Sequence, residues 1–163
     1  CTMLFGTIES IEDRMTHLDK LRSQQDSSGG FQCFVPYPFL EDNTRLPEAS
    51  LASGEEVIRV IALSRIMLDN IPHIKAYRMN IGDHLASIAI NSGADDIDGT
   101  VGHEEIMHVA GSTTSVDYDS TKLALLIVSA GQEPVKRDST YAKFEPIDSE
   151  PISDWQILPI IGQ

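Results

Sequence analysis

The stretch TMLFGTIESIED, residues 2–13, sets the pattern that the rest of the chain repeats. Residues 2–5 are apolar and stop at Gly6, which is typical of a short buried strand. Ser10-Ile11-Glu12-Asp13 then resembles a capping box with Ser10 at the N-cap. The helix that follows should end before Gly29-Gly30, because glycine adopts positive φ at little cost. The stretch therefore predicts a β-strand followed directly by an α-helix.

The same order of strand and helix recurs three more times. The predicted strands cover residues 31–35, closed by Pro36 and Pro38, and then residues 74–79 and 97–101. The predicted helices cover residues 53–69, 82–92 and 120–130, with a short helical stretch at 104–109. The first of them begins with Ser53-Gly54-Glu55-Glu56, a second Ser-x-x-Glu cap. Since each helix carries the chain back across the sheet, this alternation predicts an α/β fold with parallel strands.

Two α/β folds contain four such units: an open, doubly wound sheet, or half of an eight-stranded barrel. An open sheet that binds nucleotides would carry a Gly-rich phosphate turn after its first strand. Gly6 stands alone there, and the chain has no G-x-G-x-x-G or Walker pattern. This favours the half barrel. An open-sheet nucleotide binder stays as the alternative.

After Glu133 the composition changes, and the chain becomes rich in proline and acidic residues. We therefore divide it into a βα region, residues 1–141, and a wrapped arm or disordered tail, residues 142–163. The chain has no initiator Met, and its first residues already have the pattern of a strand. We expect an upstream portion, on the same polypeptide or on another chain.

The net charge of −13, from 25 acidic and 12 basic residues, argues against a nucleic-acid surface and against an anionic membrane surface. Two cysteines do not make a disulfide framework, and no apolar run approaches the ~20 residues of a membrane span. We expect a cytoplasmic protein.

In a barrel, chemistry lies where strands end and loops begin. Glu9 follows the first strand, where its carboxylate could hold a ribose or a cation. The alternative is that Glu9 is only an acidic residue of the turn, stabilised by the dipole of the helix that follows. Asp98 and Thr100 lie at the fourth strand, and Asp98 is the strongest candidate from the residues alone. Arg78 could bind a carboxylate through two hydrogen bonds.

Two other features are weaker. Phe34, before Pro36, could stack on a purine at the edge of the sheet, although such an aromatic is more often a core residue. His103 and His108 do not form an H-E-x-x-H pattern, and we predict no metal site.

Several long segments resemble a family of radical S-adenosylmethionine (SAM) enzymes that act in menaquinone biosynthesis by the futalosine route, and their relatives the deazaflavin synthases. TMLFGTIE, residues 2–9, is similar to the family's T-M-L-[YF]-G-H-I-E segment, with Thr7 in place of the usual His. GGFQCFVPYPF, residues 29–39, looks like G-G-F-x-x-F-[IV]-P-x-x-F. HIKAY (residues 73–77) and GADDIDGTV (residues 93–101) resemble the aminofutalosine synthases more than the cyclases of dehypoxanthine futalosine.

This resemblance implies strands five to eight of a TIM-like barrel. It implies SAM and a [4Fe-4S] cluster as cofactors, with the C-x-x-x-C-x-x-C cluster ligands outside this chain. The implied reaction adds a 5′-deoxyadenosyl radical to 3-[(1-carboxyvinyl)oxy]benzoate. By analogy, the cofactor would lie near Gly6, Thr7, Glu9, Phe34 and Pro36, and the substrate near Arg78, Asp98 and Thr100.

The expected partner is the missing N-terminal half of the barrel. Half a barrel exposes two strand edges, which could drive dimerisation. The alternatives to a synthase are a dehypoxanthine futalosine cyclase and a non-catalytic remnant or binding module of the same fold.

Overall fold

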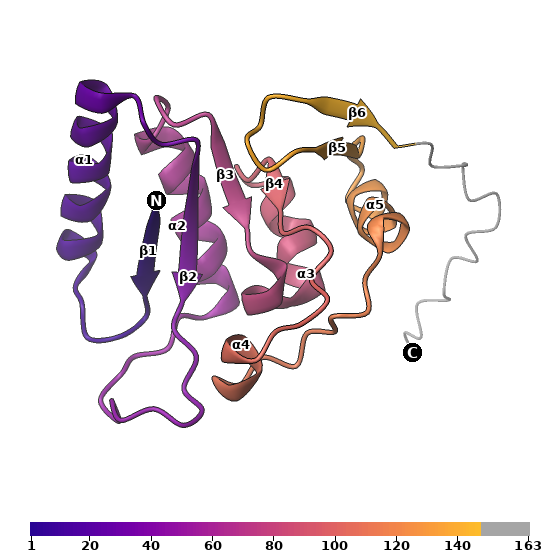
Figure 1. The fold of residues 1–163 in the computed structure, drawn as a ribbon. Coiled ribbons are helices and arrows are strands. Elements are labelled where there is room, and N and C mark those ends of the chain that lie inside the picture. Colours follow the sequence, from indigo (N-terminus) through magenta and orange to yellow (C-terminus); the bar gives the residue numbers. More distant parts are fainter. Residues whose placement is uncertain (148–163) are drawn as a thin grey trace, which may run out of the picture.

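The computed structural model describes residues 1–147, which form a four-stranded parallel sheet with helices against it and a two-stranded hairpin (Figure 1). The predicted α/β fold with parallel strands is confirmed. In chain order the elements are β1 (Thr2–Phe5), α1 (Ile11–Ser28), β2 (Cys33–Pro38), α2 (Gly54–Met67), β3 (His73–Ala76), α3 (Arg78–Ile90), β4 (Asp96–Ile97), α4 (Ile106–Val109), α5 (Ser120–Ser129), β5 (Val135–Arg137) and β6 (Phe144–Pro146).

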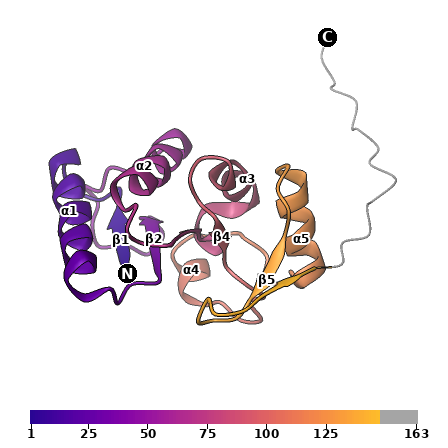
Figure 2. The ribbon, with the colours of Figure 1, turned by 90° about the horizontal axis from the view of Figure 1, so that it is seen from above.

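The strands of the sheet lie in sequence order, β1-β2-β3-β4. Helices α1, α2 and α3 lie on the same side of it (Figure 2). A doubly wound sheet would have helices on both faces and a point where the strand order reverses. Within residues 1–147 the order of the parallel sheet does not reverse. A segment of a βα barrel has this arrangement, while closure of a barrel and the numbering of the strands as five to eight stay proposals.

The predicted helix caps are confirmed. The Ser10 hydroxyl accepts a hydrogen bond from the backbone N–H of Asp13, whose carboxylate accepts one from the Ser10 N–H, so the capping box is complete. Ser53 caps α2 through a single hydrogen bond, which its hydroxyl accepts from the N–H of Glu56. Gly29 ends α1 with a φ of 60°. Local chemistry alone therefore decides where these helices begin and end.

Strand β2 is longer than the predicted residues 31–35, because it continues through Pro36 and Pro38. Val35 and Phe39 donate their backbone N–H groups to carbonyl oxygens of the β1 side at 2.9 and 2.7 Å. The alternate residues, the prolines, point their nitrogens toward β3, where the ladder has already ended. The prolines break no hydrogen bond there, so the strand tolerates them.

Two other strands are shorter than predicted. We expected residues 74–79 to be a strand, but Arg78 begins α3, because the Asp98 carboxylate accepts its backbone N–H at 2.5 Å and caps the first helical turn. The strand predicted at residues 97–101 is reduced to β4. We predicted that the third helix begins at Gly82, but α3 begins at Arg78, and Gly82, with a φ of 79°, interrupts the helix.

The sheet has two different faces. Alternate residues of the strands pack against the helices and form the hydrophobic core, among them Met3, Phe5, Phe34, Ile74 and Ala76. The residues between them point to the opposite side, which we call the inner face: Thr2, Leu4, Cys33, Val35, Tyr37, His73, Lys75 and Asp96. The strands and the helices thus form the core together, and the charged side chains of the strands, His73, Lys75 and Asp96, lie on the inner face with Tyr37.

The hairpin β5–β6 lies against the inner face near the amino-terminal ends of β3 and β4 (Figure 1). Asp96 holds it: Arg137 donates two hydrogen bonds to the carboxylate, at 2.7 and 2.8 Å, and the Tyr141 hydroxyl donates a third at 2.7 Å. Lys75 lies 3.3 Å from the same carboxylate, and the Tyr141 ring stacks on His73 with centroids 4.3 Å apart.

The division of the chain at residue 141 stays a prediction. The boundary falls within this hairpin, and residues 144–146 of the predicted arm form β6. The remainder of that arm, residues 148–163, lies outside the described residues.

Candidate functional site

The candidate site lies at the carboxyl ends of β1–β4, the lower edge of the sheet in Figure 1. The turn Gly6–Glu9 follows β1, the long loop 39–53 follows β2, Tyr77 follows β3 and Asp98 follows β4. Parallel strands bring these segments to one edge although they are far apart in the sequence.

Glu9 organises the turn after β1. Its carboxylate accepts hydrogen bonds from the N–H groups of Gly6 (2.7 Å) and Thr7 (2.8 Å), from the Thr7 hydroxyl (2.5 Å) and from Arg14 (2.7 Å). Desolvation raises the pKa of Glu9, but the hydrogen bonds from Thr7 and Gly6 outweigh it and lower that pKa to about 2. Because the chain's own donors occupy both oxygens, Glu9 shapes the turn and has little left for a ligand.

The loop 39–53 spans the edge of the sheet. Ser50 donates its N–H to the Thr7 carbonyl at 2.8 Å, so the loop rests on the Glu9 turn. A Cβ on Gly6 would lie 2.9 Å from the backbone nitrogen of Ala52, which makes glycine necessary at this contact. At its other end, Asn43 donates its side-chain amide to the Val109 carbonyl of α4 at 2.7 Å. The loop thus joins the turn after β1 to the segment after β4.

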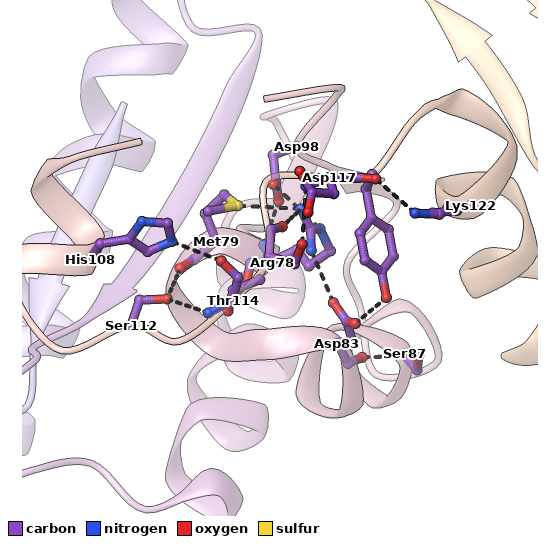
Figure 3. Close-up of polar contacts among 12 residues, drawn as sticks. Arg78, Met79, Asp83, Ser87, Asp98, His108, Ser112, Thr114, Asp117 and Lys122 are labelled. Atoms are coloured by element: carbon purple, nitrogen blue, oxygen red, sulfur yellow. Dashed lines mark hydrogen bonds and ion pairs between the residues drawn. The ribbon is translucent and has the colours of Figure 1, made fainter. Parts of the chain in front are cut away.

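Asp98 and Arg78 form a buried pair at the other end of the edge (Figure 3). Asp98 Oδ1 caps α3, while Oδ2 lies 3.8 Å from Arg78 Nε and neither atom has a hydrogen-bond partner. Burial raises the pKa of Asp98, with Arg78 and Lys75 opposing it. An unpartnered carboxylate oxygen at the end of a strand is the chemical feature that points to a ligand here.

Arg78 is fully buried, and its guanidinium is held by the protein. It donates to Asp83 (3.1 Å) and to the Ser115 carbonyl (3.0 Å), and it stacks on the Tyr118 ring at 4.3 Å (Figure 3). The Tyr118 hydroxyl also donates to Asp83 at 2.5 Å. These contacts fasten the segment before α5 to the first turn of α3. The predicted contact of Arg78 with substrate stays a prediction, and the geometry suits a positioning residue better.

Tyr37 and Tyr77 lie side by side between these two ends. Their rings meet edge to face, with centroids 5.2 Å apart. The Tyr77 hydroxyl is 3.2 Å from Glu104. Desolvation raises the pKa of both phenols, and the charges of Asp98 and Glu104 raise them further. Both tyrosines therefore keep their protons at neutral pH.

The structure brings some of the predicted site residues together and separates others. Gly6, Thr7 and Glu9 lie in one turn, and Arg78 and Asp98 contact each other. Thr100 lies beyond β4, exposed, beside a cleft of about 600 Å³ between the β4 end, α5 and the hairpin. Phe34 and Pro36 are buried on the helix side of β2, so they face away from the inner face. Their contact with the cofactor stays a prediction.

Sequence reasoning missed Asp83, Tyr118 and Glu104, which partner Arg78 and Tyr77. It also missed the Asp96–Arg137 contact that seats the hairpin. Asp83 follows Arg78 by five residues, and side chains pair on a regular helix at a separation of three or four, so spacing gives no signal for this contact. The other contacts join residues that the sequence pattern does not connect.

Two kinds of feature are absent from the described residues. Among residues 1–147, no three His, Cys, Asp or Glu side chains gather as metal ligands would. None of the helices in this part of the chain has the length and apolarity to cross a bilayer.

Several known proteins are similar to this chain. Residues 28–150 match the family described as the CofH/MqnC C-terminal region. An aminodeoxyfutalosine synthase of Thermus thermophilus is 40% identical over 144 residues, which cover 86% of this chain and 39% of that protein. A 5-amino-6-(D-ribitylamino)uracil–L-tyrosine 4-hydroxyphenyl transferase of Methanothermobacter thermautotrophicus is 35% identical over 152 residues, 90% of this chain and 41% of the other. A cyclic dehypoxanthine futalosine synthase of Streptomyces coelicolor is 32% identical over 171 residues, 99% of this chain and 42% of the other.

The chain thus spans about two fifths of the length of these curated relatives. These relatives are named for three different reactions. Their similarity agrees with the resemblance of the segments quoted above, which lie in order along the chain. The chain belongs to the CofH/MqnC C-terminal region family, whose relatives include aminodeoxyfutalosine synthases.

Proposed function

We propose that this chain is the C-terminal part of a radical SAM aminofutalosine synthase and supplies one edge of its reaction chamber. The observation that carries the proposal is the 40% identity to an aminodeoxyfutalosine synthase over 86% of the chain. The geometry is compatible with it, because the buried Asp98, the two tyrosines and the Glu9 turn all lie at the carboxyl ends of parallel strands. This is the edge where barrel enzymes hold their substrates.

The rest of the barrel would come from the N-terminal portion of the same polypeptide or from a second chain. The sequential strand order and the helices on one side favour a half barrel over an open sheet. Strands β1 and β4 each have one strand partner within residues 1–147, so each leaves an edge for strands of the other half. In our proposal these edges close the barrel, and dimerisation through them is the outcome expected for the chain alone.

The proposed cofactors are SAM and a [4Fe-4S] cluster, with cluster ligands outside this chain. When bound, this pair supplies the carbon radical that begins the reaction. Of the chain's own residues, Asp98 fits a ligand best, because its Oδ2 is buried and unpartnered. The Glu9 turn can border the binding site but does not offer its donors to a ligand, because they already bind the Glu9 carboxylate. In this proposal the chain orients the bound molecules and keeps water from them.

The test is an anaerobic assay with the intact polypeptide, or with this chain plus a partner that carries C-x-x-x-C-x-x-C. We expect SAM-dependent formation of aminofutalosine from 3-[(1-carboxyvinyl)oxy]benzoate. Asp98→Asn should reduce turnover by at least tenfold, and the exposed Glu55→Gln should leave it unchanged. Cluster-loaded protein that cleaves SAM but forms no aminofutalosine would contradict the synthase assignment.

Dehypoxanthine futalosine cyclisation is the second candidate, because a cyclic dehypoxanthine futalosine synthase aligns with 99% of the chain. Supplying dehypoxanthine futalosine in the same assay separates the two reactions. If neither substrate is consumed by cluster-loaded protein, a non-catalytic binding module of the same fold becomes the better proposal.

A further inference from the structure

The cleft of about 600 Å³ beside β4 is bounded by three different elements, and we call it the slot. Its floor is the open edge of β4, one wall is α5, and the other wall is the base of the hairpin β5–β6. Both walls carry apolar side chains. These are Leu123, Ala124 and Ile127 on α5, and Val135 and Ile147 at the base of the hairpin.

The floor of the slot is a strand edge with free backbone groups. Asp95, directly before β4, donates its backbone N–H to the Ile74 carbonyl of β3 at 3.0 Å. Because successive residues of a strand direct their backbone groups to opposite sides, Asp96 directs its own toward the slot. Within residues 1–147, β3 is the only strand that pairs with β4. This edge can therefore accept a further strand.

Helix α5 covers the place that such a strand would occupy. Helices α1, α2 and α3 each pack on strands of the sheet, whereas α5 packs on α3 and lies beyond β4 (Figure 2). Leu123 is buried, and Ile127, one turn further along α5, is half-buried and lines the slot. A strand beside β4 would lie under α5 as β2 and β3 lie under α2.

The hairpin reaches past the edge of the sheet on the opposite side. Its tip lies over β3, where the Tyr141 ring stacks on His73. Further back, Arg137 binds Asp96 of β4. Val135 precedes Arg137 by two residues, so it lies on the same face of the hairpin, and it lines the slot. Although it is apolar, Val135 is 50% exposed, which leaves an uncovered surface where a strand beside β4 would pass.

The chemistry of the slot favours an apolar strand over a charged ligand. Two acidic residues of the lining already have cationic partners, since Asp96 binds Arg137 and Asp95 lies 2.6 Å from Arg65. Apolar side chains remain on the two walls, with backbone donors and acceptors on the floor between them. A β-strand with apolar side chains matches both features at once, because its backbone pairs with the edge and its side chains cover the walls.

We propose that the slot receives one apolar β-strand of the upstream portion of the protein, which pairs with β4 in parallel and is held between α5 and the hairpin. The curated relatives have chain to supply it, because more than half of each relative's length lies outside the region that aligns with this chain. The inference rests on the proposed function in taking this upstream portion as the source. It adds that α5 and the hairpin, and not the strand edges alone, join the two portions.

Photo-cross-linking of the intact polypeptide, or of this chain with its upstream partner, tests the proposal. p-Benzoylphenylalanine is placed at position 127 in one protein and at position 135 in another, and mass spectrometry identifies the cross-linked peptides. A strand directs successive residues to opposite faces, so we expect both positions to reach neighbouring residues of one short upstream segment. The same probe in place of the exposed Ile66 on α2 is the control and should not reach that segment.

The other possible occupants give different cross-links. Cross-links from both positions to residues 148–163 would mean that the end of this chain fills the slot. Cross-links between two copies of residues 1–147 would mean that the slot joins two copies. Either result would overturn the proposal, as would cross-links to two unrelated segments or to none.

A pair of variants on α5 tests whether the slot is filled. Ile127→Glu places a carboxylate in the slot, whereas Val128→Glu places the same group at a neighbouring position that is 37% exposed and outside the lining. We expect Ile127→Glu to remove most of the cross-link from position 135 and to lower the urea midpoint, because burial of an unpaired charge is costly. Val128→Glu should leave both close to the wild type. Equal effects of the two variants would show that the slot is open to water, and the proposal would be wrong.

Neither SAM nor the iron–sulfur cluster enters these measurements. The expected cross-links in a protein that makes no aminofutalosine would leave the slot standing and reject the synthase assignment. Aminofutalosine formation in a protein whose cross-links lead elsewhere would do the opposite.

Discussion

Replacing Glu9 with Gln should destabilise the fold by about 2–3 kcal/mol at neutral pH. Folding lowers the pKa of the Glu9 carboxyl from 4.5 to about 2, because hydrogen bonds from Thr7 and Gly6 outweigh the desolvation that raises it. A change of this size corresponds to about 3 kcal/mol once the carboxyl is ionised, and screening by the solvent that still reaches the side chain reduces it somewhat. The amide introduced by Glu9→Gln would keep one acceptor oxygen and would direct its NH₂ group at donors, so most of this stabilisation should be lost.

The stabilisation that Glu9 provides should depend on pH, and the direction of its pKa change fixes how. Since the pKa of Glu9 is lower in the folded state than in the unfolded state, its contribution is fully present above about pH 4.5. It should disappear as the pH falls from about 4.5 to about 2. The gap in stability between the wild type and Glu9→Gln should therefore be largest near neutral pH and close over that range.

Urea unfolding of the intact polypeptide, followed by circular dichroism at a series of pH values between about 2 and about 7, measures this gap. The matched control is Glu55→Gln, since Glu55 is an exposed acid that pairs with Arg59 one turn away on α2. This control should behave like the wild type at every pH. A Glu9→Gln effect that stays constant down to the lowest pH would refute the reasoning, because it would show that the charge of the carboxylate does not stabilise the turn.

Three further variants test other contacts. Gly6→Ala and Gly131→Ala replace glycines with nearly the same φ, 81° and 80°. Only Gly6→Ala would place a Cβ 2.9 Å from a backbone atom, the nitrogen of Ala52. Thermal unfolding should therefore show a loss of stability of about 1 kcal/mol for Gly131→Ala and clearly more for Gly6→Ala. Asp96→Asn should loosen the hairpin, so that hydrogen exchange of residues 135–146 rises several-fold while that of α1 stays unchanged, because the carboxylate that binds Arg137 is lost. Arg78→Met should cost about 3–5 kcal/mol in urea unfolding, since it leaves the buried Asp98 without its cation; a loss below about 1 kcal/mol would argue that this pair is not structural.

The fold could be predicted from the sequence where local chemistry decides it. Ser10, Ser53 and Gly29 act through hydrogen bonds or backbone angles within a few residues, and all three caps were predicted correctly. The number and order of the βα units follow from the same signals. Strand ends were predicted less well, because they depend on neighbours in space. Pro36 is tolerated in β2 only because its nitrogen points away from β1.

The candidate site was predictable only in part for the same reason. Asp98 was identified because it follows a strand, but its action on α3 depends on Arg78, 20 residues away in the sequence. Arg78 was expected to face a substrate, whereas Asp83 and Tyr118 enclose it. Spacing shows which residues carry chemistry, and only the tertiary contacts show which of them already have partners.

The two acidic residues at this edge of the sheet, Glu9 and Asp98, differ in how many of their oxygens accept hydrogen bonds from the chain. Glu9 and Asp98 both follow a strand, and both are largely buried. Both oxygens of Glu9 accept hydrogen bonds from the chain, and the pKa of its carboxyl falls. Asp98 Oδ2 accepts no hydrogen bond, although Arg78 Nε lies 3.8 Å away, and burial raises the pKa of the Asp98 carboxyl. A carboxylate whose oxygens all accept hydrogen bonds from the chain serves the structure, whereas one with a free acceptor oxygen can still form a hydrogen bond with a ligand. For this reason Asp98, and not Glu9, is the residue at which a bound molecule should be sought.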